Sequence, residues 1–183
     1  MNNIINVILI GDINTGKSSI IKSLKFDKFS SKNESTIGVD FLSYSFDNTK
    51  LCIWDTGGEE RYNAITKMYY NKADCAIIVC DITDRNSILH IEKWLNKIKD
   101  YYNIQSIIIV CNKIDKKYDN INDIILRDCL ERIKKQNIKF LFFRSSAKIH
   151  YNIELIFKSI KINSTNKHTI KLIDRNNKHN CCN

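Results

Sequence analysis

Short apolar runs along the chain alternate with stretches in which apolar residues recur every three or four positions. Runs of the first kind predict β-strands, and stretches of the second kind predict amphipathic helices. The predicted strands are Ile4–Ile10, Phe41–Phe46, Lys50–Trp54, Cys75–Cys80, Ser106–Cys111 and Phe140–Phe143. The predicted helices are Lys17–Phe26, Ile65–Lys72, Ser87–Tyr101, Ile121–Lys135 and Asn152–Ile162. This alternation predicts an α/β domain.

Two features of the strands indicate how the sheet is built. Continuous apolar runs such as Ala76–Cys80 and Ile107–Cys111 are typical of strands that are buried on both faces of a parallel sheet. Asp47-Asn48 predicts a tight turn, so the two strands beside it should form an antiparallel hairpin. We therefore expect a doubly wound, mostly parallel six-stranded sheet with one antiparallel edge strand, helices on both faces, and ligands at the carboxyl ends of its strands.

The periodic pattern ends near Ile162, so we expect residues 1–162 to form one domain and residues 163–183 to form a flexible basic tail. From Lys158 to Asn183 there are six basic residues and one acidic residue, so this stretch carries +5 of the net charge of +9. A basic tail favours an acidic membrane surface over a nucleic-acid groove, and a merely solvated tail is the alternative.

The seven cysteines fall into two groups. Five of them lie singly in apolar or helical stretches and are predicted to be small buried side chains in a reducing compartment. Cys181 and Cys182 are adjacent and are surrounded by polar residues, which separates them from the other five.

The candidate chemistry begins with Gly11-Asp12-Ile13-Asn14-Thr15-Gly16-Lys17-Ser18, which lies between the first predicted strand and the first predicted helix. It fits the phosphate-binding pattern G-x-x-x-x-G-K-[ST]. The glycines permit a tight turn whose N–H groups converge on an anion, and the helix start adds a positive dipole end. Lys17 supplies a charge for the phosphates, and Ser18 offers a hydroxyl to Mg²⁺. A glycine-rich turn that matches by chance is the alternative.

Two further stretches could serve the metal and the terminal phosphate. Asp55-Thr56-Gly57-Gly58 follows the third predicted strand, so the Asp55 carboxylate can hold Mg²⁺ through water. The Gly58 N–H can donate to a terminal phosphate, and the Thr36 hydroxyl could complete the metal shell. Each of these stretches is common by chance when taken alone.

Two later stretches could recognise the base. Asn112-Lys113-Ile114-Asp115 follows the fifth predicted strand, and a carboxylate there can accept both N–H groups on the Watson–Crick edge of guanine. Ser145-Ser146-Ala147-Lys148 follows the sixth predicted strand, and its backbone amides can meet the guanine carbonyl oxygen. The order of all these motifs, each after a strand, makes coincidence improbable.

Together the motifs resemble those of the Ras superfamily of small GTPases, and within it the Rab family. Stretches similar to Rab signatures are Ile37–Phe41, Lys50–Trp54, Arg61–Thr66, Tyr69–Ala73 and Ile78–Asp84, and Cys181-Cys182-Asn183 is similar to the double-cysteine ending of Rabs. Ile65–Tyr70 and Trp94-Leu95 lean toward the endosomal Rab branch. The resemblance covers roughly residues 4–160 and the last three residues.

The resemblance implies a GTP/GDP switch that needs Mg²⁺, hydrolyses GTP slowly and regulates vesicle-mediated membrane trafficking by recruiting effectors. The implied catalytic residues are Lys17, Gly58 and Glu59, and the implied metal ligands are Ser18, Thr36 and Asp55. The implied nucleotide contacts are Asp12, Ile13, Asn14, Thr15, Gly16, Lys17, Ser18, Ser19, Phe29, Thr36, Asp55, Gly58, Asn112, Lys113, Asp115, Ser146, Ala147 and Lys148.

The resemblance also implies partners and a location. Effectors would dock on Ile37, Phe41, Trp54 and Tyr69, although the residues alone favour an ordinary half-buried core for the three aromatic side chains. Prenylation of Cys181 and Cys182 would attach a monomeric protein to the cytoplasmic face of an intracellular membrane, with an endosome as the expected compartment and cycling through the cytosol. An exchange factor, a GTPase-activating protein and a GDP-dissociation inhibitor are expected, and nucleic acid is not.

Two of the departures from the family pattern bear on hydrolysis. Glu59 stands where the family has the glutamine that orients the attacking water, and a carboxylate brings negative charge toward the γ-phosphate. Ile13 stands where the family has a small residue beside that phosphate, and a β-branched side chain should crowd the same space. Both changes predict slow intrinsic hydrolysis. Rab-activating proteins as a family supply an arginine and a glutamine in trans, so stimulated turnover could persist.

The sequence leaves two other functions open. In the first, the chain holds GTP and scarcely hydrolyses it, so that it acts as a scaffold. In the second, a soluble GTPase acts on RNA or ribosomes, which the net charge of +9 suggests. This second function needs a basic face on the folded domain, whereas most of the excess charge lies in the predicted tail.

Overall fold

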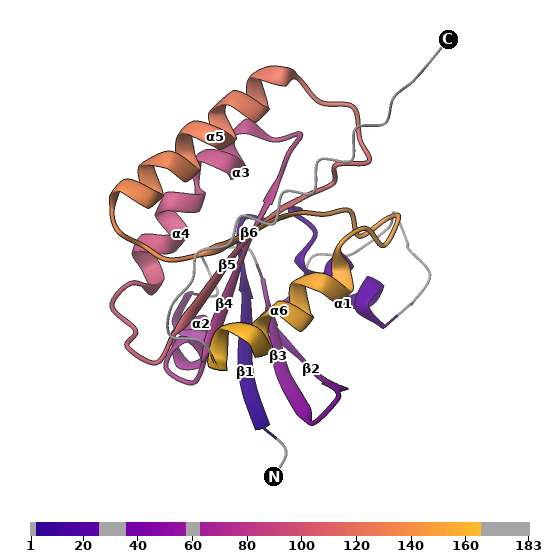
Figure 1. Ribbon diagram of the computed structural model, residues 1–183, viewed down its shortest axis with the longest axis vertical. Helices are drawn as coiled ribbons and strands as arrows, with labels where there is room; N and C mark the ends of the chain where they lie inside the picture. The colour runs from indigo at the N-terminus through magenta and orange to yellow at the C-terminus, as the bar shows by residue number, and fades with distance from the viewer. Residues whose placement is uncertain (1–2, 26–35, 58–62, 166–183) are drawn as a thin grey trace.

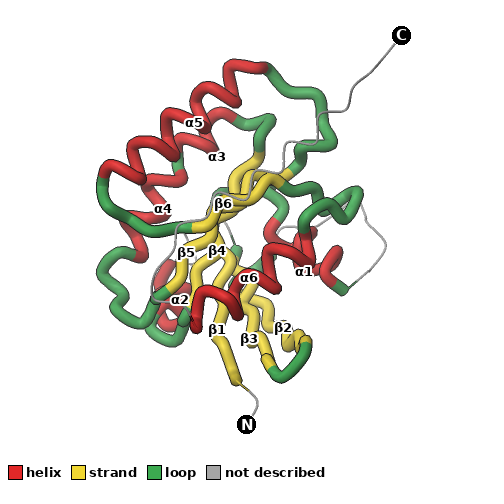
Figure 2. The backbone as a smooth tube through the Cα atoms, in the orientation of Figure 1, coloured by secondary structure: helices red, strands yellow, loops and turns green. Residues whose placement is uncertain are grey.

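The computed structural model describes residues 3–25, 36–57 and 63–165. Figures 1 and 2 show a central sheet with helices on both of its faces. The strands are β1 (Asn3–Ile10), β2 (Val39–Phe46), β3 (Thr49–Thr56), β4 (Cys75–Asp81), β5 (Ser106–Asn112) and β6 (Leu141–Arg144). The helices are α1 (Lys17–Leu24), α2 (Asn63–Tyr70), α3 (Arg85–Leu89), α4 (Ile91–Ile98), α5 (Asn120–Lys135) and α6 (Ile153–Thr165).

The six strands form one sheet in the order β2-β3-β1-β4-β5-β6. Only β2 and β3 pair antiparallel in it, joined by a turn in which Asp47 has a φ of 48°. The other pairs are parallel, so the carboxyl ends of β1, β3, β4, β5 and β6 meet at one edge. The predicted fold class is confirmed, and the motifs that follow these strands are brought to that edge.

The core lies on both faces of the sheet (Figure 1). On one face, α1 and α6 cover apolar side chains of the strands, among them Leu9 and Val110. On the other face, α2, α3, α4 and α5 cover a second set that includes Ile8 and Ile109. Every residue of β4 is buried, which is expected of a central parallel strand covered on both faces.

The predicted single helix Ser87–Tyr101 is wrong, because the structure divides this stretch into α3 and α4. The Asp84 side chain accepts the Asn86 N–H at 3.0 Å and starts α3 earlier than predicted. The backbone at His90 has φ −75° and ψ −5°, a rotation away from ordinary helical values that separates the two helices. The apolar period continues through the break, so periodicity alone could not reveal it.

Smaller differences lie at the ends of other elements. The last strand is Leu141–Arg144 rather than Phe140–Phe143, and α6 extends to Thr165, beyond Ile162. α1 is Lys17–Leu24, and Phe26, the predicted end of that helix, lies outside the described residues. Helix and strand ends are the features that local patterns define least well.

The cysteines within the domain agree with the prediction for most positions. Cys75, Cys80, Cys111 and Cys129 are buried, and Cys52 is partly exposed. Burial raises the pKa of the Cys75 thiol to about 12, so it stays protonated at neutral pH. These buried side chains act as small apolar residues in the core.

Candidate functional site

The loop between β1 and α1 takes a shape that only glycine allows at two positions. Gly11 has φ 142° and Gly16 has φ 96°. A Cβ atom would lie 2.2 Å from the Val79 carbonyl oxygen at Gly11 and 2.4 Å from the Asn112 amide nitrogen at Gly16. Asn14 has φ 61°, a left-handed conformation that asparagine tolerates better than most residues. The predicted phosphate loop therefore has the close-packed backbone that its motif requires.

Lys17 begins α1 directly after this loop and is only 5% exposed. Its Nζ donates to the carbonyl oxygens of Gly11 at 2.9 Å and Asp12 at 2.8 Å. Burial lowers the pKa of Lys17 to about 8, and the charges of Asp55 and Asp12 partly offset that effect. An ammonium group removed from water gains more from a phosphate than a solvated one does, because the local dielectric is low.

The three predicted Mg²⁺ ligands lie together at the start of α1. The hydroxyl oxygens of Ser18 and Thr36 are 2.8 Å apart. Asp55 is 4% exposed, and its Oδ1 has no hydrogen-bond partner among the described residues. Burial raises the pKa of Asp55, and a hydrogen bond from Ser18 opposes that rise. Two hydroxyls and a buried carboxylate form an oxygen-only donor set, which fits Mg²⁺.

Asn112, at the end of β5, joins three of the predicted motifs. Its Nδ2 donates to the Thr15 carbonyl oxygen at 3.0 Å, and its Oδ1 accepts the Ala147 N–H at 3.2 Å. The residue is 1% exposed, so these bonds are made away from water. Asn112 thus holds the phosphate loop and the loop after β6 in a fixed relation.

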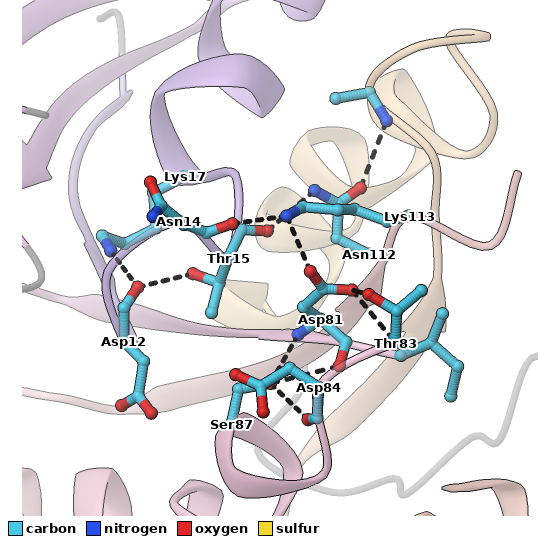
Figure 3. A network of polar contacts seen from close by, with 12 residues as sticks. Asp12, Asn14, Thr15, Lys17, Asp81, Thr83, Asp84, Ser87, Asn112 and Lys113 are labelled. Carbon is cyan, nitrogen blue, oxygen red and sulfur yellow. Dashed lines mark hydrogen bonds and ion pairs between the residues drawn. The ribbon is translucent and has the colours of Figure 1, made fainter. Parts of the chain in front are cut away.

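Lys113 links the phosphate loop to the end of β4 (Figure 3). Its Nζ lies 2.5 Å from the Asn14 carbonyl oxygen and 2.6 Å from Oδ2 of Asp81. Asp81 ends β4, and its Oδ1 accepts hydrogen bonds from the backbone and hydroxyl of Thr83 at 2.9 and 2.8 Å. Asp81 was not among the predicted site residues, although its place at a strand end was a signal that could have identified it.

The predicted base-recognition residues also come together. Ser146 Oγ donates to Asp115 Oδ1 at 2.5 Å, and Lys148 Nζ lies 4.0 Å from the other Asp115 oxygen. The Ser146 N–H donates to the Tyr151 carbonyl oxygen at 3.2 Å, and the Ala147 N–H donates to Asn112. Two of the amides proposed for the guanine carbonyl oxygen therefore already have partners within the protein.

Arg144 directly precedes this loop and is held by three side chains from other segments. Its guanidinium group donates to the Tyr118 hydroxyl at 3.1 Å and pairs with Asp123 of α5. Asn152 in turn donates to the Arg144 carbonyl oxygen at 2.8 Å. These contacts tie the two predicted base-recognition loops to the rest of the domain.

The three aromatic residues among the predicted effector residues form a row across β2, β3 and α2. The ring centroids of Phe41 and Trp54 are 6.0 Å apart, and those of Trp54 and Tyr69 are 5.6 Å apart. Trp54 and Tyr69 are partly buried against the core, whereas Phe41 is 61% exposed and Ile37 is 82% exposed. The half-buried interpretation therefore holds for two of the three aromatic residues and not for Phe41.

Of the other predicted site residues, two lie within the described part of the chain and five lie outside it. Ile13 is an exposed residue of the phosphate loop, and Ser19 is partly exposed in the first turn of α1. Phe29, Gly58, Glu59, Cys181 and Cys182 lie outside the described residues.

Asp12 is a predicted nucleotide contact, but its carboxylate points toward the segment where α4 begins. It accepts hydrogen bonds from His90 Nδ1 at 2.6 Å and Trp94 Nε1 at 2.7 Å. Sequence reasoning missed His90 and Trp94 as neighbours of this loop, because no local pattern places a residue of α4 beside residue 12.

Comparison with known proteins agrees with this arrangement. The family model of the Ras family matches residues 6–166. Ras-related protein Rab11A of Lotus japonicus is 36% identical over 163 residues, covering 86% of this chain and 70% of that protein. Ras-related protein Rab-18-B of Danio rerio is 33% identical over 162 residues, covering 85% and 77%. Ras-related protein Rab-11B of Dictyostelium discoideum is 36% identical over 160 residues, covering 84% and 70%. The chain belongs to the Ras family and is a Rab-type small GTPase, a class of protein that acts in membrane trafficking.

Proposed function

We propose that this chain is a GTP/GDP switch that binds its nucleotide with Mg²⁺ and recruits effectors to regulate vesicle-mediated membrane trafficking. The observation that carries the proposal is the junction at Asn112, which joins the phosphate loop to the loop after β6 through bonds of 3.0 and 3.2 Å. A cradle for phosphates and a carboxylate for the base are thereby held at one edge of the sheet. The Asp115 carboxylate favours guanine over adenine, since adenine lacks the pair of N–H donors that the two carboxylate oxygens would accept.

The switch in this proposal involves the segments around Thr36 and α2. Thr36 contacts Ser18 at the proposed metal site, and α2 follows β3, which ends beside Asp55. Amide hydrogen exchange should therefore slow in residues 36–42 and 63–70 when GDP is replaced by a non-hydrolysable GTP analogue. Equal exchange rates in the two loaded forms would contradict the switch.

We also propose that intrinsic GTP hydrolysis is slower than in a typical Rab. Ile13 is 44% exposed, so its branched apolar side chain is not buried in the core, and the family pattern puts this position beside the γ-phosphate. Glu59 would add a negative charge toward the same phosphate. Without a helper protein, Ras-type hydrolysis already runs at about 10⁻⁴ s⁻¹, so a slower chain would stay in the GTP state for hours.

This proposal gives a testable result for two substitutions. We expect Ile13→Ser and Glu59→Gln each to accelerate single-turnover GTP hydrolysis, by roughly threefold to thirtyfold. The measurement is release of radiolabelled phosphate from preloaded protein. Ile121→Ser, at an exposed isoleucine of α5, is the matched control and should leave the rate unchanged. If both substitutions at the site leave the rate unchanged, slow hydrolysis does not arise from these residues.

A scaffold that holds GTP and scarcely hydrolyses it is the second candidate, and the exposed Ile13 side chain is the observation that favours it. Multiple-turnover assays with and without a cell lysate separate the two functions. Stimulation by the lysate would support the cycling switch, whereas a rate that stays near zero would support the scaffold.

Membrane attachment is proposed to depend on the basic stretch from Lys158 and on prenylation of Cys181 and Cys182. Within the described residues, none of the helices combines the length and the apolar character needed to cross a membrane. Two prenyl chains suffice for stable attachment where one is marginal. Imaging the wild type beside the double substitution Cys181→Ser, Cys182→Ser tests this proposal and the endosomal location together. Diffuse signal from both proteins would contradict it.

A further inference from the structure

Asp12 presents its backbone and its carboxylate to opposite sides of the phosphate loop. Its carbonyl oxygen accepts hydrogen bonds from Lys17 Nζ at 2.8 Å and from the Thr15 hydroxyl at 2.9 Å, inside the loop. Its carboxylate is directed away from Lys17, as Figure 3 shows. The loop therefore carries a negative charge that is turned outward rather than toward the phosphates.

Two donors hold the carboxylate in this outward position. Trp94 Nε1 donates to Oδ1 at 2.7 Å, and His90 Nδ1 lies 2.6 Å from Oδ2. A carboxylate offers acceptors only, so the hydrogen of the second bond is on His90 Nδ1. Each oxygen of Asp12 thus has its own donor, and rotation of the carboxylate would break both bonds.

The two donors lie close together in the chain: His90 is the residue between α3 and α4, and Trp94 lies in α4. His90 and Trp94 are four residues apart, a spacing that puts side chains on the same face of a helix. The backbone N–H of Trp94 donates to the His90 carbonyl oxygen at 3.0 Å, so one helical turn connects the two residues. Trp94 is 6% exposed in the core, which fixes the position of its indole nitrogen. The His90 side chain is 44% exposed, so it can be replaced without opening the core.

We propose that His90 is a positioning residue that acts through Asp12 to keep the phosphate loop closed on its nucleotide and so slows nucleotide release. This inference rests on the proposed nucleotide site. With the His90 bond lost, the Asp12 carboxylate is held by a single donor and can turn toward the phosphates, where like charges repel at low dielectric. The same motion disturbs the carbonyl oxygen that positions Lys17.

The test compares two replacements of His90 in the full chain loaded with a fluorescent GDP. His90→Phe keeps a ring but has no donor, whereas His90→Asn places an amide nitrogen on Cγ, where the imidazole has Nδ1. We expect release of the label to be roughly threefold to tenfold faster in His90→Phe, since a hydrogen bond to a charged group is lost at a partly exposed site. Release from His90→Asn should return to near the wild-type rate.

A double substitution separates positioning from a general loss of stability. In an Asp12→Ala background, His90→Phe should leave the release rate unchanged, because the residue through which His90 acts is gone. The inference is overturned if His90→Phe releases at the wild-type rate, if His90→Asn releases as fast as His90→Phe, or if the effect persists in the Asp12→Ala background. A wild-type chain that fails to bind the labelled GDP would instead overturn the proposed function itself.

Discussion

Replacing Asp115 by asparagine is expected to lower the affinity of this chain for GDP by roughly a hundredfold to ten-thousandfold. In the proposed site, the two carboxylate oxygens accept the two N–H groups of the guanine edge. Asparagine keeps one acceptor oxygen and turns an N–H donor toward the other guanine N–H. A hydrogen bond to a charged group contributes about 1.5–3 kcal/mol and a buried donor left unpaired costs about 1–3 kcal/mol, so the two effects together correspond to that range. Competition against a fluorescent GDP measures the change.

The Asp115→Asn chain should also bind a different base, xanthine, more tightly than the wild type does. Asp115→Asn exchanges one acceptor for a donor, which suits xanthine, because xanthine has a carbonyl oxygen where guanine has its exocyclic amine. A gain for xanthosine diphosphate distinguishes altered recognition from simple unfolding. Asp128→Asn, at an exposed position of α5, is the control and should leave both affinities unchanged. If Asp115→Asn binds GDP as tightly as the wild type does, Asp115 does not recognise the base.

Replacing Lys17 by alanine is expected to weaken binding of GDP and GTP by roughly thirtyfold to several-thousandfold. The loss of one partner of a buried charge pair costs about 2–5 kcal/mol, because the remaining phosphate charge is left unpaired. Lys22→Ala, at an exposed lysine of the same helix, should bind as the wild type does. Thermal unfolding of nucleotide-free protein checks that Lys17→Ala still folds.

The lowered pKa of Lys17 gives the same prediction a second readout. Burial lowers this pKa to about 8 from an ordinary value of 10.5, so the nucleotide-free protein loses the proton above about pH 8. Bound phosphates favour the charged form and raise the pKa again, so nucleotide binding between these pH values takes up a proton and weakens as the pH rises. Calorimetry at about pH 8.5 in two buffers of different ionisation enthalpy should detect this uptake in the wild type and not in Lys17→Ala.

Local patterns were sufficient to predict the fold class and to choose candidate residues for the site. Continuous apolar runs predicted β4 and β5, and the rule that ligands lie at the carboxyl ends of parallel strands placed Lys17, Asp55 and Asp115 at one edge of the sheet. Gly11 and Gly16 could be assigned in advance because the motif needs backbone conformations that other residues resist.

Contacts between distant segments could not be predicted in this way. The bond between His90 and Asp12 joins residues 78 positions apart, and the bond between Asn112 and Thr15 joins residues 97 apart. The first depends on the packing of α4 against the sheet and the second on the order of the strands within the sheet, and neither follows from spacing along the chain. The break at His90 could not be predicted for a related reason, since the apolar period continues from α3 into α4 without interruption.

Release of a fluorescent GDP from the purified chain tests the central claim, a guanine-specific site that depends on Mg²⁺, most directly. In Mg²⁺, excess unlabelled GDP or GTP should displace the label and excess ATP should not. Chelation of the metal should accelerate release, because the Ser18, Thr36 and Asp55 oxygens then lose the ion that joins them to the phosphates. Displacement by ATP as effective as that by GDP, or a release rate indifferent to chelation, would contradict the account.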